Sequence, residues 1–196
     1  MPRHTRKELE AARAATIADV LPGPGDPPLR VLFCGINPGL VSAATGHHFA
    51  RPGNRFWPAL AGAGFTPRVL LPAEQEELLG LGLGVTNVVP RATARADELT
   101  TEELVAGGDR LRRLVADVAP AWLAVVGVTA YRVAFGAPRA AVGAQPDALG
   151  RTRVWVLPNP SGLNAHWQLP EMVAEFARLR AAVPPPRRYG VTARDA

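Results

Sequence analysis

The segment RVLFCGINPG, residues 30–39, indicates the class of fold, because a short apolar run ends there in an abrupt Asn-Pro-Gly turn. Three later runs have the same character: LGVTNVV (83–89), WLAVVG (122–127) and RVWVLP (153–158). Continuous apolar runs of this length, rich in β-branched residues, are typical of buried parallel strands. The sequence therefore predicts four parallel strands in one sheet.

Helical signals separate these four runs. Asn54 precedes RFWPALAGAG, Pro72 opens PAEQEELLG, and Thr100 forms a capping box with Glu103. Two further helices are predicted over 128–135 and 170–183. The alternation predicts an α/β protein: a three-layer α/β/α sandwich with a four-stranded parallel sheet and right-handed crossovers.

The ends of the chain differ in character from its middle. Residues 29–183 are expected to form the single domain, and residues 184–196 a basic, Pro-rich tail that we expect to be disordered. Residues 1–28 are expected to be an N-terminal arm and linker, with a helix over 6–20 that turns Leu9, Ile17 and Val20 inward. The stretch LPGPGDPP ends that arm.

Composition narrows the class of protein. The chain of 196 residues has a net charge of +5, and all its basic residues except Lys7 are arginines, a mild excess that is compatible with nucleic acid. The single cysteine, Cys34, excludes an internal disulfide and a cysteine-based zinc site. No apolar run is long enough to span a membrane, so we expect a cytoplasmic protein.

Two Asn-Pro turns leave the predicted sheet at the same edge: Asn37-Pro38-Gly39 after the first strand and Asn159-Pro160-Ser161-Gly162 after the last. A third asparagine, Asn87, ends the second strand. Ligands of open α/β sheets bind beyond the carboxyl ends of the strands, so these turns mark the expected site. The residues between 37 and 54 carry no predicted helix or strand, and loops of that length in compact domains are usually functional.

Each of these features has a simpler alternative explanation. An isolated Asn-Pro-Gly is most often only a tight turn, and NPSGLN at 159–164 could merely cap the last strand with Leu163 in the core. The adjacent His47 and His48 lack companions at metal-ligand spacing, so no metal site is predicted. Neither a GxGxxG nor a Walker loop follows the first strand, which counts against a nucleotide hydrolase or transferase.

The full string GINPGLVSAATGHHFARPGNRFW (35–57), taken with VWVLPNPSGL (154–163), closely resembles the motifs of the mismatch-specific uracil/thymine-DNA glycosylases. These are a branch of the uracil-DNA glycosylase superfamily, and the resemblance extends over about residues 29–182. It implies a monofunctional enzyme that flips uracil, and related damaged pyrimidines, out of a G·U mismatch in duplex DNA. The resemblance further implies that the enzyme hydrolyses the N-glycosidic bond and leaves an abasic site in base excision repair, with no metal or other cofactor. A noncatalytic DNA- or nucleotide-binding module at the same sheet edge is the alternative.

The resemblance also implies roles for residues of the predicted site. Asn37 would orient the attacking water, and Phe49 would stack on the flipped base. The backbone at Ile36, together with Asn87 and Asn159, would line the base pocket, although Asn87 stands where some relatives carry Lys. Asp97 or its neighbour Glu98 could supply the carboxylate that Asn37 lacks, unless both are merely solvated loop acids.

The second motif implies the contacts with duplex DNA. Leu163 is the expected wedge that fills the gap left by the base, with Ser161, Gly162 and Asn164 beside the orphaned guanine and nearby phosphates. Arg51, Arg55 and Arg91 are expected phosphate partners. The chain departs from its relatives at Ala165-His166-Trp167, where they carry Arg soon after the wedge. A monomer, bound to DNA at the nucleoid, is expected.

Overall fold

A five-stranded sheet forms the centre of the computed structural model, which describes residues 4–185. The strand order is β2-β1-β3-β5-β4. Four strands are parallel, β1 (Val31–Gly35), β2 (Leu83–Asn87), β3 (Trp122–Val126) and β5 (Thr152–Leu157), and they match the four predicted runs. The prediction of a parallel α/β sheet is confirmed.

The strand count of four was wrong, because β4 (Gly143–Leu149) adds a fifth, antiparallel strand at the edge beside β5. Its sequence GAQPDAL has no apolar run, and most of its residues are exposed or half-buried. The pairing is irregular between Ala144 and Ala148, the stretch that contains Pro146. Proline is tolerated at sheet edges and bulges, which is why this strand has no strand-like signature in the sequence.

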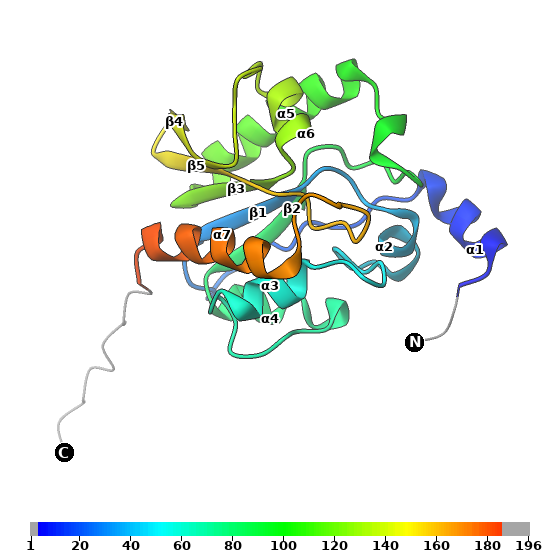
Figure 1. Ribbon diagram of the computed structural model, residues 1–196, viewed down its shortest axis with the longest axis horizontal. Helices are drawn as coiled ribbons and strands as arrows, with labels where there is room; N and C mark the ends of the chain where they lie inside the picture. Colours follow the sequence, from blue (N-terminus) through cyan, green and yellow to red (C-terminus); the bar gives the residue numbers. More distant parts are fainter. Residues whose placement is uncertain (1–3, 186–196) are drawn as a thin grey trace.

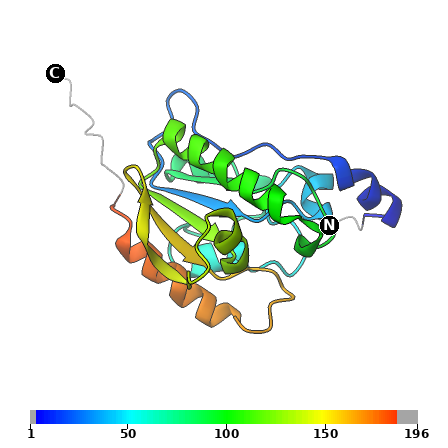
Figure 2. The same cartoon turned by 90° about the horizontal axis from the view of Figure 1, so that it is seen from above.

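Helices cover both faces of the sheet (Figures 1 and 2). On one face α3 (Phe56–Gly62), α4 (Glu77–Gly80) and α7 (Leu169–Ala182) pack around Phe33. On the other, α5 (Thr101–Val118) and α6 (Val128–Ala134) pack around Leu32 and Cys34. Neighbouring strand residues thus enter opposite layers, as the pleat requires, and the predicted three-layer sandwich is confirmed.

Several predicted helix starts are present. Thr100 and Glu103 form the expected capping box of α5, and the Asn54 side-chain oxygen accepts a hydrogen bond from the Phe56 amide at 2.9 Å. The long loop after β1 was predicted without secondary structure, yet it contains α2 (Leu40–Thr45). That helix ends where Gly46 takes the left-handed conformation, with φ of 74°.

The N-terminal segment differs from its predicted helix over 6–20. Helix α1 (Arg6–Ala11) is followed by the 3-10 turn η1 (Ala12–Ala14) and then by an extended segment, residues 15–20, which we call the strap. The main chain of Val20 pairs with that of Val85 at 2.8 and 3.0 Å, so the strap covers the outer edge of β2. Ile17 and Val20 are buried. The tail prediction lies largely beyond residue 185, outside the described residues.

No helix within residues 4–185 is long and apolar enough to cross a membrane.

The polar turns predicted from the sequence all lie at the carboxyl ends of the parallel strands. The fold therefore brings together the segments that the sequence singled out.

Candidate active site

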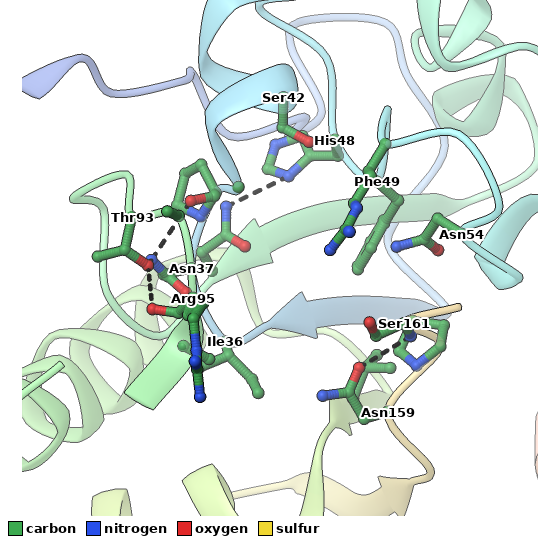
Figure 3. Close-up of a pocket in the computed structure, with 18 of the residues that line it drawn as sticks. Ile36, Asn37, Ser42, His48, Phe49, Asn54, Thr93, Arg95, Asn159 and Ser161 are labelled. Carbon is green, nitrogen blue, oxygen red and sulfur yellow. Dashed lines mark hydrogen bonds between the residues drawn. The ribbon is translucent and has the colours of Figure 1, made fainter. Parts of the chain in front are cut away.

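A cavity of about 370 Å³ opens at the carboxyl ends of the parallel strands (Figure 3). Its volume falls in the range of small-molecule sites. Most of the predicted site residues line it: Ile36, Asn37, Phe49, Arg51, Asn87, Asp97, Asn159, Ser161 and Leu163. Gly162, Asn164 and Arg55 do not line the cavity. Instead, the Arg55 guanidinium donates to the carbonyls of the other two.

Asn37 follows β1, and its amide nitrogen is tied to the loop after β2. The Nδ2 group donates to the Arg91 carbonyl at 2.9 Å and to the Thr93 hydroxyl at 2.7 Å. Because a carbonyl can only accept, this contact fixes which end of the amide is nitrogen. The Asn37 Oδ1 has no hydrogen-bond partner within residues 4–185 and remains available as an acceptor at the cavity.

Thr93 holds the loop that anchors Asn37. Its hydroxyl donates to the Arg95 carbonyl at 2.7 Å while accepting from Asn37, and its amide donates to the Pro38 carbonyl at 3.1 Å. Thr93 is buried, with a relative exposure of 1%. The turn after β1 and the loop after β2 are therefore joined by hydrogen bonds around the Asn37 amide (Figure 3).

Asn87, at the end of β2, is oriented by a chain of hydrogen bonds that begins in the strap. His48 Nε2 lies 3.0 Å from the Ala18 carbonyl, so this nitrogen must carry the proton. Burial lowers the pKa of His48, which keeps the ring neutral and leaves Nδ1 as an acceptor. Asn87 Nδ2 lies 3.3 Å from that Nδ1 and donates to it. The amide orientation of Asn87 is therefore fixed, and among the described residues its second N–H and its Oδ1 have no hydrogen-bond partner.

The strap also supports the main chain of Asn87. Asp19 accepts a hydrogen bond from the Thr86 hydroxyl at 2.7 Å and forms a 3.3 Å ion pair with Arg110. The Arg110 guanidinium in turn donates to the Asn87 carbonyl. Both the side chain and the main chain of Asn87 thus depend on contacts with residues of the strap.

Phe49 occupies a strained position beside Asn87. Its φ of 54° lies in the left-handed region, which is rare for a bulky residue. Phe56 stacks on one face of the ring, with centroids 3.9 Å apart, and the half-buried Phe49 side chain lines the cavity. Gly35 makes room for this arrangement, because a Cβ there would lie 2.5 Å from Asn87 Oδ1 and 3.3 Å from Phe49 Cζ.

The two candidate acids have different surroundings. Asp97 lines the cavity and pairs with Arg95, and its side chain is 62% exposed. Glu98 does not line the cavity. It forms a 2.6 Å ion pair with Arg13 and accepts a hydrogen bond from the Arg95 amide at 2.9 Å. Of the two, Asp97 is the one that lines the cavity.

The loop over residues 159–168, which we call the wedge loop, is held together by hydrogen bonds between its own residues. Asn159 Oδ1 accepts from the Ser161 amide at 2.9 Å, and the Asn164 side chain donates to the Asn159 carbonyl at 2.9 Å. Leu163 is 73% exposed at its tip. The alternative in which Leu163 packs in the core is wrong.

The predicted phosphate partners also differ in their contacts. Arg51 is exposed at the cavity rim. Arg91 forms a bidentate ion pair with Glu103 at 2.7 and 2.9 Å, which lowers the pKa of Glu103 to about 2. The Arg55 guanidinium donates to carbonyls of the wedge loop. Arg55 and Arg91 therefore bind other parts of this protein, whereas Arg51 is the most open of the three.

Several cavity residues were not predicted as site residues: Ile17, Ser42, His48, Asn54, Thr93 and Arg95. His48 was considered only as a metal ligand, and both of its ring nitrogens are engaged in hydrogen bonds. The position of His48 in the sequence, next to the predicted base-stacking residue Phe49, was the signal that could have marked it as a site residue. Nothing in the local sequence could have placed Ile17 here, since it belongs to the strap. No cluster of metal-ligating side chains occurs in the part of the chain that the structure describes.

A comparison with known families agrees with this geometry. The family model described as the Uracil DNA glycosylase superfamily matches residues 22–181, well over half of the chain. The matched range contains the turn after β1, the loop after β2 and the wedge loop. It begins after the strap, which the match does not cover. The chain belongs to the uracil DNA glycosylase superfamily.

Proposed function

We propose that this protein is a monofunctional glycosylase that flips uracil out of G·U mismatched DNA and hydrolyses its N-glycosidic bond, leaving an abasic site for base excision repair. Related damaged pyrimidines would be further substrates, and a monomer would suffice. The observation that carries the proposal is the Asn37 amide, whose nitrogen is fixed by Arg91 and Thr93 while Oδ1 is left at the cavity.

Water activation would be weak at such a site. As uracil leaves with the bonding electrons, the sugar gains positive charge and a water must add to C1′. An amide oxygen accepts a hydrogen bond from that water and orients it, but it takes up no proton at neutral pH. Asp97 at the cavity rim would stabilise the cationic sugar or accept the proton released by the water.

Base recognition would use the fixed amide of Asn87. A base held in such a pocket is read along its Watson–Crick edge. Uracil presents an acceptor, O4, beside a donor, N3–H, and the free N–H and Oδ1 of Asn87 complement this pair. Cytosine presents the reverse pattern and would require the amide to turn over. That turn would set Oδ1 against the lone pair of His48 Nδ1, which disfavours cytosine.

Extraction of the base would use the aromatic and apolar groups. Phe49 has one face covered by Phe56, and its other face would stack on the flipped uracil. Leu163 would enter the duplex and occupy the vacated space, at an unstacking cost of a few kcal/mol that is lower in a mismatch. A weakly activated water, together with the lower free-energy cost of unstacking a mismatched base, favours an enzyme that acts on mismatches.

Oligonucleotide cleavage tests the proposal. The protein is incubated with uracil in G·U duplex, A·U duplex and single-stranded DNA, and abasic sites are then cleaved with alkali. We expect scission that is fastest for G·U. Asn37→Ala should slow the single-turnover rate about 100- to 1000-fold, by analogy with the loss of one fixed polar contact to the transition state, while duplex affinity stays within about tenfold. Tight binding without scission by the unmodified protein would instead identify a noncatalytic DNA-binding module.

A further inference from the structure

Arg55 connects the two motifs of the site through the main chain of the wedge loop. Its Nη1 donates to the carbonyls of Asn164, at 3.1 Å, and Trp167, and its Nη2 donates to the carbonyl of Gly162 at 3.2 Å. The Arg55 amide also donates to the Pro160 carbonyl at 2.9 Å. A single residue thus binds carbonyls spread along most of the wedge loop.

The bound carbonyls lie on both sides of the exposed tip. Gly162 and Asn164 flank Leu163, whose side chain is 73% exposed and therefore gains little from packing against the protein. The contact with Gly53 adds a steric limit, because a Cβ on Gly162 would lie 2.7 Å from the Gly53 carbonyl. The conformation at Leu163 is consequently set by hydrogen bonds to the main chain around it.

We propose that Arg55 is a positioning residue that holds Leu163 ready to enter the duplex, an inference that rests on the proposed function. A guanidinium is a planar fork with donors in fixed directions, so it can bind several carbonyls at once and define their relative positions. A lysine at this position would keep the positive charge but would reach fewer of them. The role of Arg55 therefore depends on its shape as well as on its charge.

A role as a phosphate partner makes a different prediction. Loss of one phosphate contact weakens binding to matched and mismatched duplexes alike and reduces the salt-dependence slope by about 0.9. Arg55→Lys keeps the positive charge, so it removes the positioning contact while a phosphate contact and its slope are retained. The positioning contact acts only where Leu163 must enter a stacked duplex, so cleavage of single-stranded uracil should not change.

The test compares Arg55→Lys, Leu163→Ala and the double variant. Single-turnover cleavage is measured on uracil in G·U duplex and in single-stranded DNA. We expect Arg55→Lys to slow duplex cleavage by about 10- to 100-fold, as a displacement of about 1 Å in a positioned group does, and single-strand cleavage by less than twofold. The double variant should be no slower than Leu163→Ala alone, because both changes remove the same contribution.

A second measurement is independent of cleavage. 2-Aminopurine placed next to the mismatch fluoresces when the base step is unstacked, and we expect Arg55→Lys to reduce this signal at saturating protein. Arg132→Lys is the matched control, because Arg132 donates to the Ala140 carbonyl at 2.8 Å in a loop away from the cavity. It should match the unmodified protein in both measurements.

Two different failures can be distinguished. If the unmodified protein cleaves neither substrate but unstacks the duplex, and Arg55→Lys does not, the proposed reaction is wrong and the positioning role stands. The positioning role is overturned if Arg55→Lys leaves fluorescence and duplex cleavage unchanged, if it slows both substrates equally, or if its effect adds fully to that of Leu163→Ala. It is also overturned if the unmodified protein gives no unstacking signal at all.

Discussion

Gly35→Ala should disable the site by displacing the Asn87 amide, although it replaces no residue assigned to contact the substrate. A Cβ at this position would lie 2.5 Å from Asn87 Oδ1 and 3.3 Å from Phe49 Cζ, whereas ordinary contacts begin at about 3.4 Å. The Asn87 amide must therefore move by roughly 0.9 Å, and misplacement by about 1 Å costs on the order of 100-fold in rate. We expect single-turnover cleavage of a G·U duplex to fall by about that factor.

Folding should survive the same change. Overpacking a buried position typically costs about 1–3 kcal/mol, and each kcal/mol lowers Tm by about 2–4 °C in a chain of this size. Thermal unfolding monitored by circular dichroism measures this cost. Gly80→Ala is the control, because a Cβ there meets nothing within 4 Å. Cleavage by Gly35→Ala within threefold of the unmodified rate, with a normal Tm, would refute the role assigned to the Asn87 orientation.

Three further predictions concern titratable groups. Asp97→Ala should slow single-turnover cleavage more than Glu98→Ala does, because only Asp97 lines the cavity; equal, negligible effects would make both ordinary loop acids. Since burial lowers the pKa of His48 below 6.5, the unfolded chain takes up a proton before the folded one, so stability should decline as pH falls below about 6.5. His48→Gln should flatten that decline in urea unfolding curves taken from pH 5 to 8. The pKa of Glu103 is lowered to about 2, so its ion pair with Arg91 stabilises the fold above pH 4.5 and is lost as pH falls towards 2. The Tm difference between the unmodified protein and Glu103→Gln should therefore shrink over that interval and stay constant above it.

The parallel strands could be predicted because each is an uninterrupted apolar run. Val31, Leu32 and Phe33 are fully buried, as a strand covered on both faces requires. The same apolar character marks where each strand ends, so Asn37, Asn87 and Asn159 could be placed at one edge of the sheet. The predicted ends of the strands were therefore enough to place many of the candidate site residues.

The features that were missed depend on contacts between distant residues. Strand β4 is held by pairing with β5 and carries Pro146, so its own sequence does not resemble a strand. The strap is extended because Val20 pairs with Val85, whereas an isolated chain with the same apolar spacing resembles an amphipathic helix. The tautomer of His48 is likewise set by the Ala18 carbonyl, 30 residues away in sequence. No local pattern encodes such contacts.

We expect that the strap can detach from the sheet while the rest of the native state stays folded. It is held to β2 by the two main-chain hydrogen bonds of Val20, by the hydrogen bond from Thr86 to Asp19 and by the buried side chains of Ile17 and Val20, and its release requires no strand of the central sheet to separate. Segments of this kind open with less free energy than the global fold. Each such opening would free the His48 ring from the Ala18 carbonyl and allow the Asn87 amide to turn over. The accuracy with which uracil is told from cytosine would then be limited by how rarely the strap detaches, a quantity that amide hydrogen exchange at Val20 and Val85 measures.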